Sequence, residues 1–268
     1  MSIIPTYQSS FRVMIQFMHR DLKVYGKKFK DQFINTLFLY PIFFAISGLV
    51  QANIFFRGDA VMFGATNFFA CSPTLPLLVI TYHLVFELFY DLEGNRFINY
   101  QVMMLDPHLV LLEKLIMTTL ISFLSIVPFY PMAYFLVSKS YVDISLSQWI
   151  GAYLVLFSAS FCLCAYNLCA SVVLRKDTLN IFWNRINHCL VVFGGFWIPS
   201  SLLIEYWAPL KYLLYLNPLH FLSEGLRNAI IGKNHFMPYQ ESILGLFLLG
   251  IVFTLYALHR FKKRIDHV

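Results

Sequence analysis

Hydrophobic residues in this chain gather in long stretches that carry no charged side chain. Six stretches of 18 or more residues contain no Asp, Glu, Lys or Arg: 32–56, 60–86, 115–138, 144–174, 186–204 and 242–259. A helix that crosses the ~30 Å hydrocarbon core of a bilayer needs about 20 mostly apolar residues. The pattern therefore predicts six transmembrane helices, at 33–54, 60–86, 110–137, 148–174, 178–203 and 242–259.

Two prolines, Pro73 and Pro76, interrupt the second predicted helix. Proline has no backbone N–H and its ring crowds the preceding turn, so we expect a kink at this place. Such a kink either shapes a path through the protein or adapts the helix to its neighbours, and the pattern leaves both interpretations open.

The segment 8–32, ahead of the first predicted span, has the periodicity of an amphipathic helix. Its apolar residues recur every three or four positions: Phe11, Met14, Ile15, Met18, Leu22, Tyr25 and Phe29. Basic residues fill the other faces, and a basic helix with an aromatic-rich stripe is typical of the membrane interface. The alternative is a soluble helix packed on a partner. Because the first span follows directly, we expect an interfacial helix and no cleaved signal peptide.

The stretch 204–240 is apolar but interrupted, and no spanning helix fits it. It contains Trp207, Pro209, the pair Asn217-Pro218, and Pro238. Tryptophan and tyrosine prefer the depth of the membrane interface. We therefore expect short helices that form an outer re-entrant region before the last span.

Composition and charge support an all-α membrane protein with a single transmembrane domain, 1–268. Charged residues make up 13% of the chain and hydrophobic residues 59%, too few charges to cover a soluble domain. The side that would hold both termini carries 13 Lys and Arg against 5 on the other side, with Lys114 and Arg185 left out. Positive charge favours the cytoplasmic side, so both termini are expected there. The net charge of +6 then needs no nucleic acid to explain it.

The connection 87–109 is the longest predicted cytoplasmic loop, and it is acidic. Its charged residues are Glu87, Asp91, Glu93, Arg96 and Asp106, and Pro107 follows directly. The positive-inside bias does not explain acidic residues on this side. The loop is either simply solvated or a docking surface for a cytoplasmic partner with basic contacts.

A polar stripe marks the fifth predicted span. Asn180, Asn184 and Asn187 recur at intervals of 4 and 3, with Arg185 and His188 beside them. Polar groups inside a membrane usually face a water-filled cavity or other protein. The stripe therefore either lines a path or forms hydrogen bonds between helices, with Arg185 reaching the headgroups.

Motifs for several kinds of chemistry are absent from the sequence. It contains no G-x-x-x-x-G-K-[ST], no H-E-x-x-H and no G-x-S-x-G, which argues against a P-loop, a zincin site and a hydrolase elbow. No histidine has metal-ligand spacing, and no span carries a chain of carboxylates for proton relay. We therefore expect no catalytic residues, metal or cofactor in this chain. If it moves a substrate, the energy comes from elsewhere.

Short motifs near the C-terminal end, together with the order of elements, resemble a known family. The motifs are Phe196-Trp197-Ile198-Pro199-Ser200-Ser201, then Leu216-Asn217-Pro218-Leu219-His220-Phe221, then Glu224, Arg227 and Gly232. This pattern is similar to that of the permease subunit of type-2 ABC exporters. The run Leu105-Asp106-Pro107 followed by Glu113-Lys114 also resembles the family's cytoplasmic loop. The chain departs from the family where a Gly-Thr pair would stand, at Ile98 and Asn99.

The resemblance implies a function as well as a fold. The permease, not itself an enzyme, would pair with a second permease copy, as a homodimer rather than a heterodimer, and with ATP-binding subunits that carry ATP and Mg. It would export an amphipathic, lipid-like, drug-like or lipid-linked glycan substrate through a bacterial inner membrane. The loop residues Glu87, Asp91, Glu93, Arg96, Asp106 and Pro107 would contact the ATPase. The motif residues Asn217, Pro218, Glu224, Arg227 and Gly232 would be structural.

Two other functions are compatible with the sequence. The first is a membrane-embedded enzyme that modifies lipids, with Asp106 and His108, or Arg185 and His188, as its reactive groups. No recognised catalytic constellation supports it. The second is a non-catalytic assembly or anchoring subunit.

Overall fold

The structure is a computed structural model that describes residues 7–40, 42, 50, 69–93, 107–137, 144–174, 178, 181–196, 200, 204–205, 207–232 and 236–265. All regular structure in these residues is helical, as the sequence predicted. The elements are α1 (Tyr7–Ile34), η1 (Asn35–Leu39), α4 (Thr74–Glu93), α6 (Pro107–Ile126), α7 (Phe129–Val137), α8 (Leu146–Val173), η3 (Trp183–Asn187), α10 (His188–Phe193), α12 (Leu210–Leu214), α13 (Pro218–Ile231) and α14 (Tyr239–Ile265).

Four helical stretches are long and apolar enough to cross a membrane: Phe69–Phe86, His108–Phe135, Leu146–Val173 and Tyr239–Phe261. They correspond to the predicted spans 60–86, 110–137, 148–174 and 242–259. The chain thus has the character of a multi-pass helical membrane protein. Of the predicted span 33–54, residues 41, 43–49 and 51–54 lie outside the described residues, and 178–203 is described as a continuous helical stretch only from 181 to 193. The count of six spans stays a prediction.

Several helices run further than the spans predicted from hydropathy. Helix α4 continues through Glu93 into the predicted loop 87–109, α6 begins at Pro107, and α14 begins at Tyr239. Hydropathy marks the part of a helix that fits the hydrocarbon, whereas the hydrogen-bonded helix can continue into the headgroups and water. Helix α1 likewise extends the predicted 8–32 by a few residues at its end.

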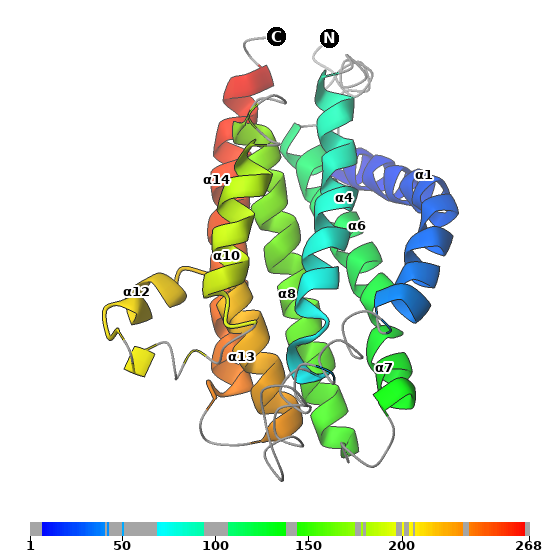
Figure 1. Ribbon diagram of the computed structural model, residues 1–268. Helices are drawn as coiled ribbons and strands as arrows, with labels where there is room; N and C mark the ends of the chain where they lie inside the picture. The colour runs from blue at the N-terminus through cyan, green and yellow to red at the C-terminus, as the bar shows by residue number, and fades with distance from the viewer. Residues whose placement is uncertain are drawn as a thin grey trace, which may run out of the picture.

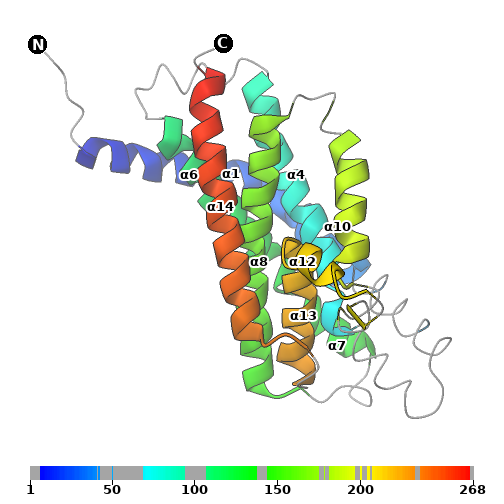
Figure 2. The same ribbon diagram turned by 90° about the vertical axis from the view of Figure 1, so that its left-hand side faces the viewer.

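Helix α8 forms the centre of the bundle, with α4, α6, α13 and α14 packed around it (Figures 1 and 2). Its buried side chains are small at many positions, including Ala152, Ala159 and Cys162, all fully buried. Small side chains let neighbouring helices approach closely. Gly250 of α14 does the same from the other side, since a Cβ there would lie 2.5 Å from Cε1 of Phe161.

Prolines break two of the spanning stretches near one end of the bundle. The chain turns at Ser72-Pro73 before α4, and at Val127-Pro128 between α6 and α7. The predicted interruption of the second span is therefore observed at Pro73, whereas Pro76 lies inside the first turn of α4. The two breaks are tied together, because the Tyr130 hydroxyl donates to the carbonyl of Ala70 at 2.5 Å.

Helix α1 lies across the bundle rather than along it (Figure 2). Phe17 and Asp21 are buried, and α1 packs mainly on α6. Arg12 and Lys23 are exposed on a polar side, while Ile15 and Leu22 are apolar and about half exposed. Helix α1 thus has a protein-facing, a polar and an apolar face, and its location at the membrane interface stays a prediction.

A buried ion pair joins α1 to α6. The ammonium of Lys114 contacts the carboxylate of Asp21, with side chains 4% and 5% exposed. Arg20 donates to the same carboxylate at 2.9 Å, and Glu113 lies 3.9 Å from Lys114. Charges in an apolar interior are tolerated only when paired. The orientation of α1 therefore depends on a contact between residues 93 positions apart.

We predict that Lys114→Met lowers the free energy of unfolding by about 3–5 kcal/mol, because it leaves Asp21 and Glu113 buried without their ammonium. The measurement is thermal and denaturant unfolding of the purified chain in detergent. Adding Asp21→Asn to Lys114→Met should recover part of the loss. Lys30→Met, an exposed position on α1, is the control, and an equal loss in both single variants would contradict the prediction.

Candidate functional site

The centre of the candidate site is a buried ion pair on α13. Arg227 and Glu224 are each 1% exposed, and Nη1 of Arg227 donates to Oε1 of Glu224 at 3.0 Å. They stand three residues apart, so one helix face presents both side chains. Removing a guanidinium and a carboxylate from water is unfavourable unless further hydrogen bonds satisfy them.

Those further bonds come from two other segments of the chain. Nη2 of Arg227 donates to the carbonyl of Phe196 at 2.9 Å, and the N–H of Ser200 donates to Glu224 at 3.0 Å. The Cys71 thiol lies 3.4 Å from the same Phe196 carbonyl and 3.5 Å from Nη2 of Arg227. We call Cys71, Phe196, Ser200, Glu224 and Arg227 the Arg227 cluster. It joins α13, the break after α10 and the helical turn before α4.

Two glycines allow the break after α10 to lie against α13. Gly195 adopts φ +73°, a conformation that favours glycine. A Cβ at Gly194 would lie 2.8 Å from Cβ of Leu219, closer than ordinary packing permits. The Ser223 hydroxyl donates to the carbonyl of Gly194. Side chains of α13 therefore donate to two carbonyls, those of Gly194 and Phe196, in the backbone that follows α10.

The remaining motif residues determine where α13 begins and ends. Asn217 is its N-cap: Oδ1 accepts from the N–H of Leu219 at 2.9 Å, while Nδ2 donates to the carbonyl of Leu190 at 2.8 Å. Pro218 stands in the first turn, where its missing N–H is harmless. Gly232 ends the helix with φ +67°, the left-handed conformation of a C-terminal cap.

His220 lies one turn before Glu224 and is also buried. Burial lowers the pKa of its imidazole from the ordinary value, nearby Glu224 raises it, and Arg227 lowers it. The neutral form is therefore favoured, and the positive charge in this part of the site rests on Arg227.

The predicted polar stripe is divided between two environments. Asn184 and His188 are exposed, as is Arg185, whereas Asn187 is 4% exposed and accepts from the Tyr166 hydroxyl at 2.9 Å. Asn180 lies outside the described residues. The stripe was expected on α-helical spacing, but residues Trp183–Asn187 form a π-helical turn, which changes the angular offset between neighbours. One member thus bonds to a neighbouring helix and the others face outward.

The predicted coupling residues lie around one end of the bundle. Glu87, Asp91 and Glu93 belong to the last turns of α4, and Pro107 is the first residue of α6. Arg96 and Asp106 lie outside the described residues. The end of α4 is near the end of α14 and opposite α7 (Figure 1).

Two contacts were not anticipated from the sequence, one in this site and one outside it. One is the participation of Cys71, and the other is the Asp21–Lys114 pair. A Glu-Lys pair within an apolar run signals a buried partner, but it does not reveal which residue that partner is. Among the described residues, no group of three or more His, Cys, Asp or Glu is arranged to hold a metal ion.

A scan against models of known protein families matched none, and a comparison with curated protein sequences found no match.

We predict a graded loss of stability at position 227. Arg227→Lys keeps the charge but cannot form both bonds of the guanidinium fork. The free energy of unfolding should therefore fall by about 1.5–3 kcal/mol. Arg227→Met leaves Glu224 buried without a cation and should cost about 3–5 kcal/mol.

The measurement is equilibrium unfolding in detergent, with Arg260→Lys as the control. Arg260 is an exposed arginine of α14, and its variant should stay within about 0.5 kcal/mol of the parent chain. If all three variants unfolded alike, the structural importance of the Arg227 cluster would be refuted.

Proposed function

We propose that this chain is the transmembrane permease subunit of an ATP-driven exporter of the type-2 ABC kind. It would move an amphipathic, lipid-like, drug-like or lipid-linked glycan substrate out of the cytoplasm or the inner leaflet. The observation that carries the proposal is the Arg227 cluster. The motif residues Glu224 and Arg227, on which the family resemblance was based, meet the aromatic break at Phe196 and Ser200.

The geometry of α13 supports the re-entrant region at 204–240. With 14 residues at about 1.5 Å each, α13 is about 21 Å long, too short to cross a bilayer. It is nevertheless buried against α8 and α14. Irregular backbone is tolerated at membrane depth only where protein satisfies its polar groups. Arg227 and Ser223 do this for the carbonyls of Phe196 and Gly194.

The outward face of η3 and α10 supports pairing with a second permease copy. Ile186, Val192 and Phe193 are between 43% and 58% exposed, and exposed Asn184 and His188 lie on the same stretch. Polar side chains within a membrane need protein or a water-filled path beside them. In the proposed homodimer, this face of each copy would border the substrate path, and the stretch 178–203 would be the fifth of six spans.

The acidic end of α4 supports docking by an ATP-binding subunit. A helix C-terminus carries partial negative charge, so acidic residues in the last turns are unfavourable there without cationic partners. Glu87, Asp91 and Glu93 occupy this position. A partner with basic contacts would compensate them. ATP-driven movement of that partner would then displace α4 and α6 together, and the nucleotide must favour one state by several kcal/mol.

The proposed topology has both termini on the cytoplasmic side of a bacterial inner membrane. The first turns of α1 and the last turn of α14 lie toward the same end of the molecule (Figure 2), which is consistent with an even number of spans. Basic residues at the end of α14, including Arg260 and Lys263, agree with a cytoplasmic location for that end.

We predict that a tagged chain purified gently from its native membrane brings a P-loop ATPase with it. Replacing Glu87, Asp91 and Glu93 together by Lys should reduce the recovered ATPase about tenfold or more, since juxtaposed like charges cost several kcal/mol. Glu241→Lys is the control. Glu241 is exposed in the first turn of α14, whereas the end of α14 that lies near the end of α4 is its last turn (Figure 1). Recovery of the chain without any ATPase, even after cross-linking, would refute the permease proposal.

The alternative is a membrane-embedded enzyme that modifies lipids. Its support is that Arg185 and His188 are both exposed on one stretch, while His108 is only partly exposed and Asp106 lies outside the described residues. If the chain is a permease subunit, we expect the purified chain alone to turn over no phospholipid in mixed micelles. Turnover that disappears in His188→Ala or His108→Ala, but persists in the exposed control His259→Ala, would favour the enzyme instead.

A further inference from the structure

Glu113 of α6 differs from the other buried acidic side chains that the structure describes. It is 2% exposed, and its Oε1 has no hydrogen-bond partner. Its Oε2 lies 3.9 Å from Nζ of Lys114, which is longer than a hydrogen bond. Asp21 and Glu224, in contrast, both accept hydrogen bonds from cations. An ionised carboxylate that is buried without hydrogen bonds is strongly unfavourable, so the state of Glu113 needs an explanation.

The cations beside Glu113 are bonded to another carboxylate. The ammonium of Lys114 contacts Oδ2 of Asp21, and Oδ1 of Asp21 accepts from Nε and Nη2 of Arg20 at 3.0 and 2.9 Å. We call Arg20, Asp21, Glu113 and Lys114 the α1–α6 charge cluster. The side chain of Arg20 is 45% exposed, so water screens its charge. The buried part of the cluster thus holds two acidic groups and one cation.

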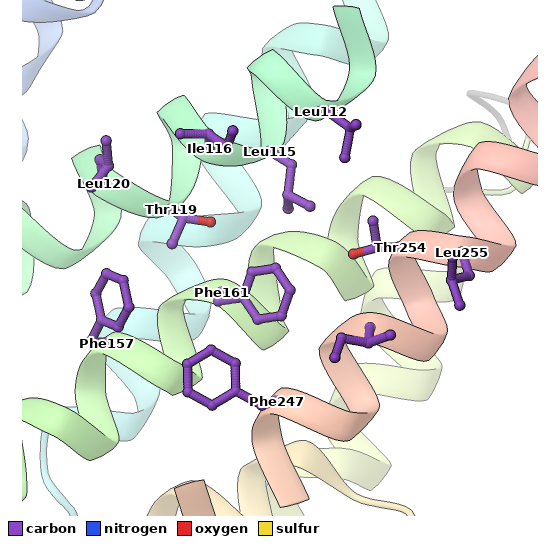
Figure 3. A pocket seen from close by; sticks show the side chains of 11 residues that line it. Leu112, Leu115, Ile116, Thr119, Leu120, Phe157, Phe161, Phe247, Thr254 and Leu255 are labelled. Atoms are coloured by element: carbon purple, nitrogen blue, oxygen red, sulfur yellow. The ribbon is translucent and has the colours of Figure 1, made fainter. Parts of the chain in front are cut away.

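The rest of the surroundings of Glu113 is apolar. One turn before it along α6, Val110 is 5% exposed, and one turn after it, Met117 is 1% exposed. The neighbouring residues Leu112 and Leu115 line a groove between α6, α8 and α14, shown in Figure 3, and none of the described residues that line this groove is charged. An ionised carboxylate at position 113 would therefore have apolar side chains around it in place of water, which makes the charged form costly.

The described charged groups that face Glu113 come from only two helices. They are Lys114 of α6 itself and Arg20 and Asp21 of α1, and the Asp21 carboxylate lies within hydrogen-bonding reach of Glu113. Helix α8 has no charged residue. The charged and imidazole side chains described on α4 and α14 are exposed: His83, Glu241, His259 and Arg260. In the part of the chain that the structure describes, no further cation thus balances a second carboxylate.

We propose that Glu113 is a proton-binding site of the folded chain, occupied at neutral pH. Its carboxylate takes up one proton from water, and the resulting O–H donates a hydrogen bond to the Asp21 carboxylate. Two carboxylates beside one buried cation repel each other, and a proton held by one of them removes the repulsion. The buried part of the cluster then carries one negative and one positive charge. The added O–H also supplies the hydrogen bond that Glu113 otherwise lacks.

The proton would form part of the contact between α1 and α6. Asp21 belongs to α1 and Glu113 to α6, so the proposed hydrogen bond joins the two helices beside the contact made by Lys114. Release of the proton would replace this bond by repulsion between two carboxylates. The strength with which α1 is held on α6 therefore falls as the pH rises. The inference goes beyond the proposed function and does not depend on it, because the proton site needs neither an ATPase nor a second copy.

The first test is infrared spectroscopy of the purified full chain in a maltoside detergent, which has no carbonyl group. A protonated carboxyl group has a C=O stretching band that an ionised carboxylate lacks, and this band shifts in D2O, whereas the ester bands of residual lipid do not. The parent chain should show the band at neutral pH, and Glu113→Gln should lose it. Glu241→Gln is the matched control, because Glu241 is exposed on α14, and it should keep the band.

The second test is the thermal unfolding of the same three proteins as a function of pH. A folded state that holds a proton which the unfolded chain releases loses stability as the pH rises. The window begins where a glutamate in water ionises, at a pH of about 4.3, and ends above neutral pH, where the folded chain releases its proton. Glutamine keeps the shape and the donor of the protonated acid but cannot ionise. The unfolding midpoint of the parent should therefore lie close to that of Glu113→Gln in acid and fall below it as the pH rises, while Glu241→Gln follows the parent.

Two results would overturn the inference. One is the absence of the carboxylic acid band from the parent chain, or a band of equal strength in Glu113→Gln. The other is a parent midpoint that stays level with that of Glu113→Gln, or rises relative to it, as the pH increases, because a carboxylate stabilised by ion pairs behaves in this way. Should Glu113→Gln fail to fold, Glu113→Met takes its place in both tests, and failure of both variants to fold would mean that an ionised Glu113 is required. Co-purification of an ATPase is a separate readout, so failure of either proposal leaves the other intact.

Discussion

The hydrogen bonds of Arg227 join α13 to the non-helical backbone after α10, where apolar packing alone would leave backbone polar groups without partners. In an apolar interior, each backbone carbonyl that leaves a helix needs a donor from the protein. The guanidinium supplies one to Phe196 and at the same time neutralises Glu224, whose carboxylate accepts from the Ser200 N–H. Because these partners lie on different segments, one side chain determines where the break after α10 meets α13.

The Asp21–Lys114 pair plays the same part at the other end of the bundle. Helix α1 lies against α6 through apolar packing that includes Phe17 and Leu115, and the buried ammonium of Lys114 finds its carboxylate on α1. In both places the apolar packing around α8 provides most of the contact surface. A buried ion pair as a whole adds little stability, whereas removal of one partner is strongly unfavourable because it leaves a buried charge unpaired.

Charge is also divided over the surface at the end of the molecule where α4 ends and α6 begins. Acidic residues stand on the last turns of α4, whereas the exposed charges described on α1 and at the end of α14 are cations. A protein partner with basic contacts and a layer of anionic headgroups would therefore meet different parts of this end.

Much of the fold could be predicted from the sequence, and the reason is that burial in hydrocarbon is a local property of about 20 consecutive residues. The four stretches able to cross a membrane were predicted in this way. The helix at 8–32 was predicted from its periodicity and the interruption at Pro73 from the missing N–H of proline, which are also local properties. The start of α13 at Asn217-Pro218 is a local feature as well, because capping is decided within one turn.

Other features depend on which distant residues meet, and only the tertiary structure decided them. The sequence placed Asn184 and Asn187 on one stripe, but the π-helical turn and the Tyr166 hydroxyl separate them. It gave no reason to join Cys71 to Arg227, 156 positions away, or Asp21 to Lys114. Periodicity within a helix records which face is apolar, whereas the partner of a buried charge is determined by how the helices cross, and that is a property of the whole bundle.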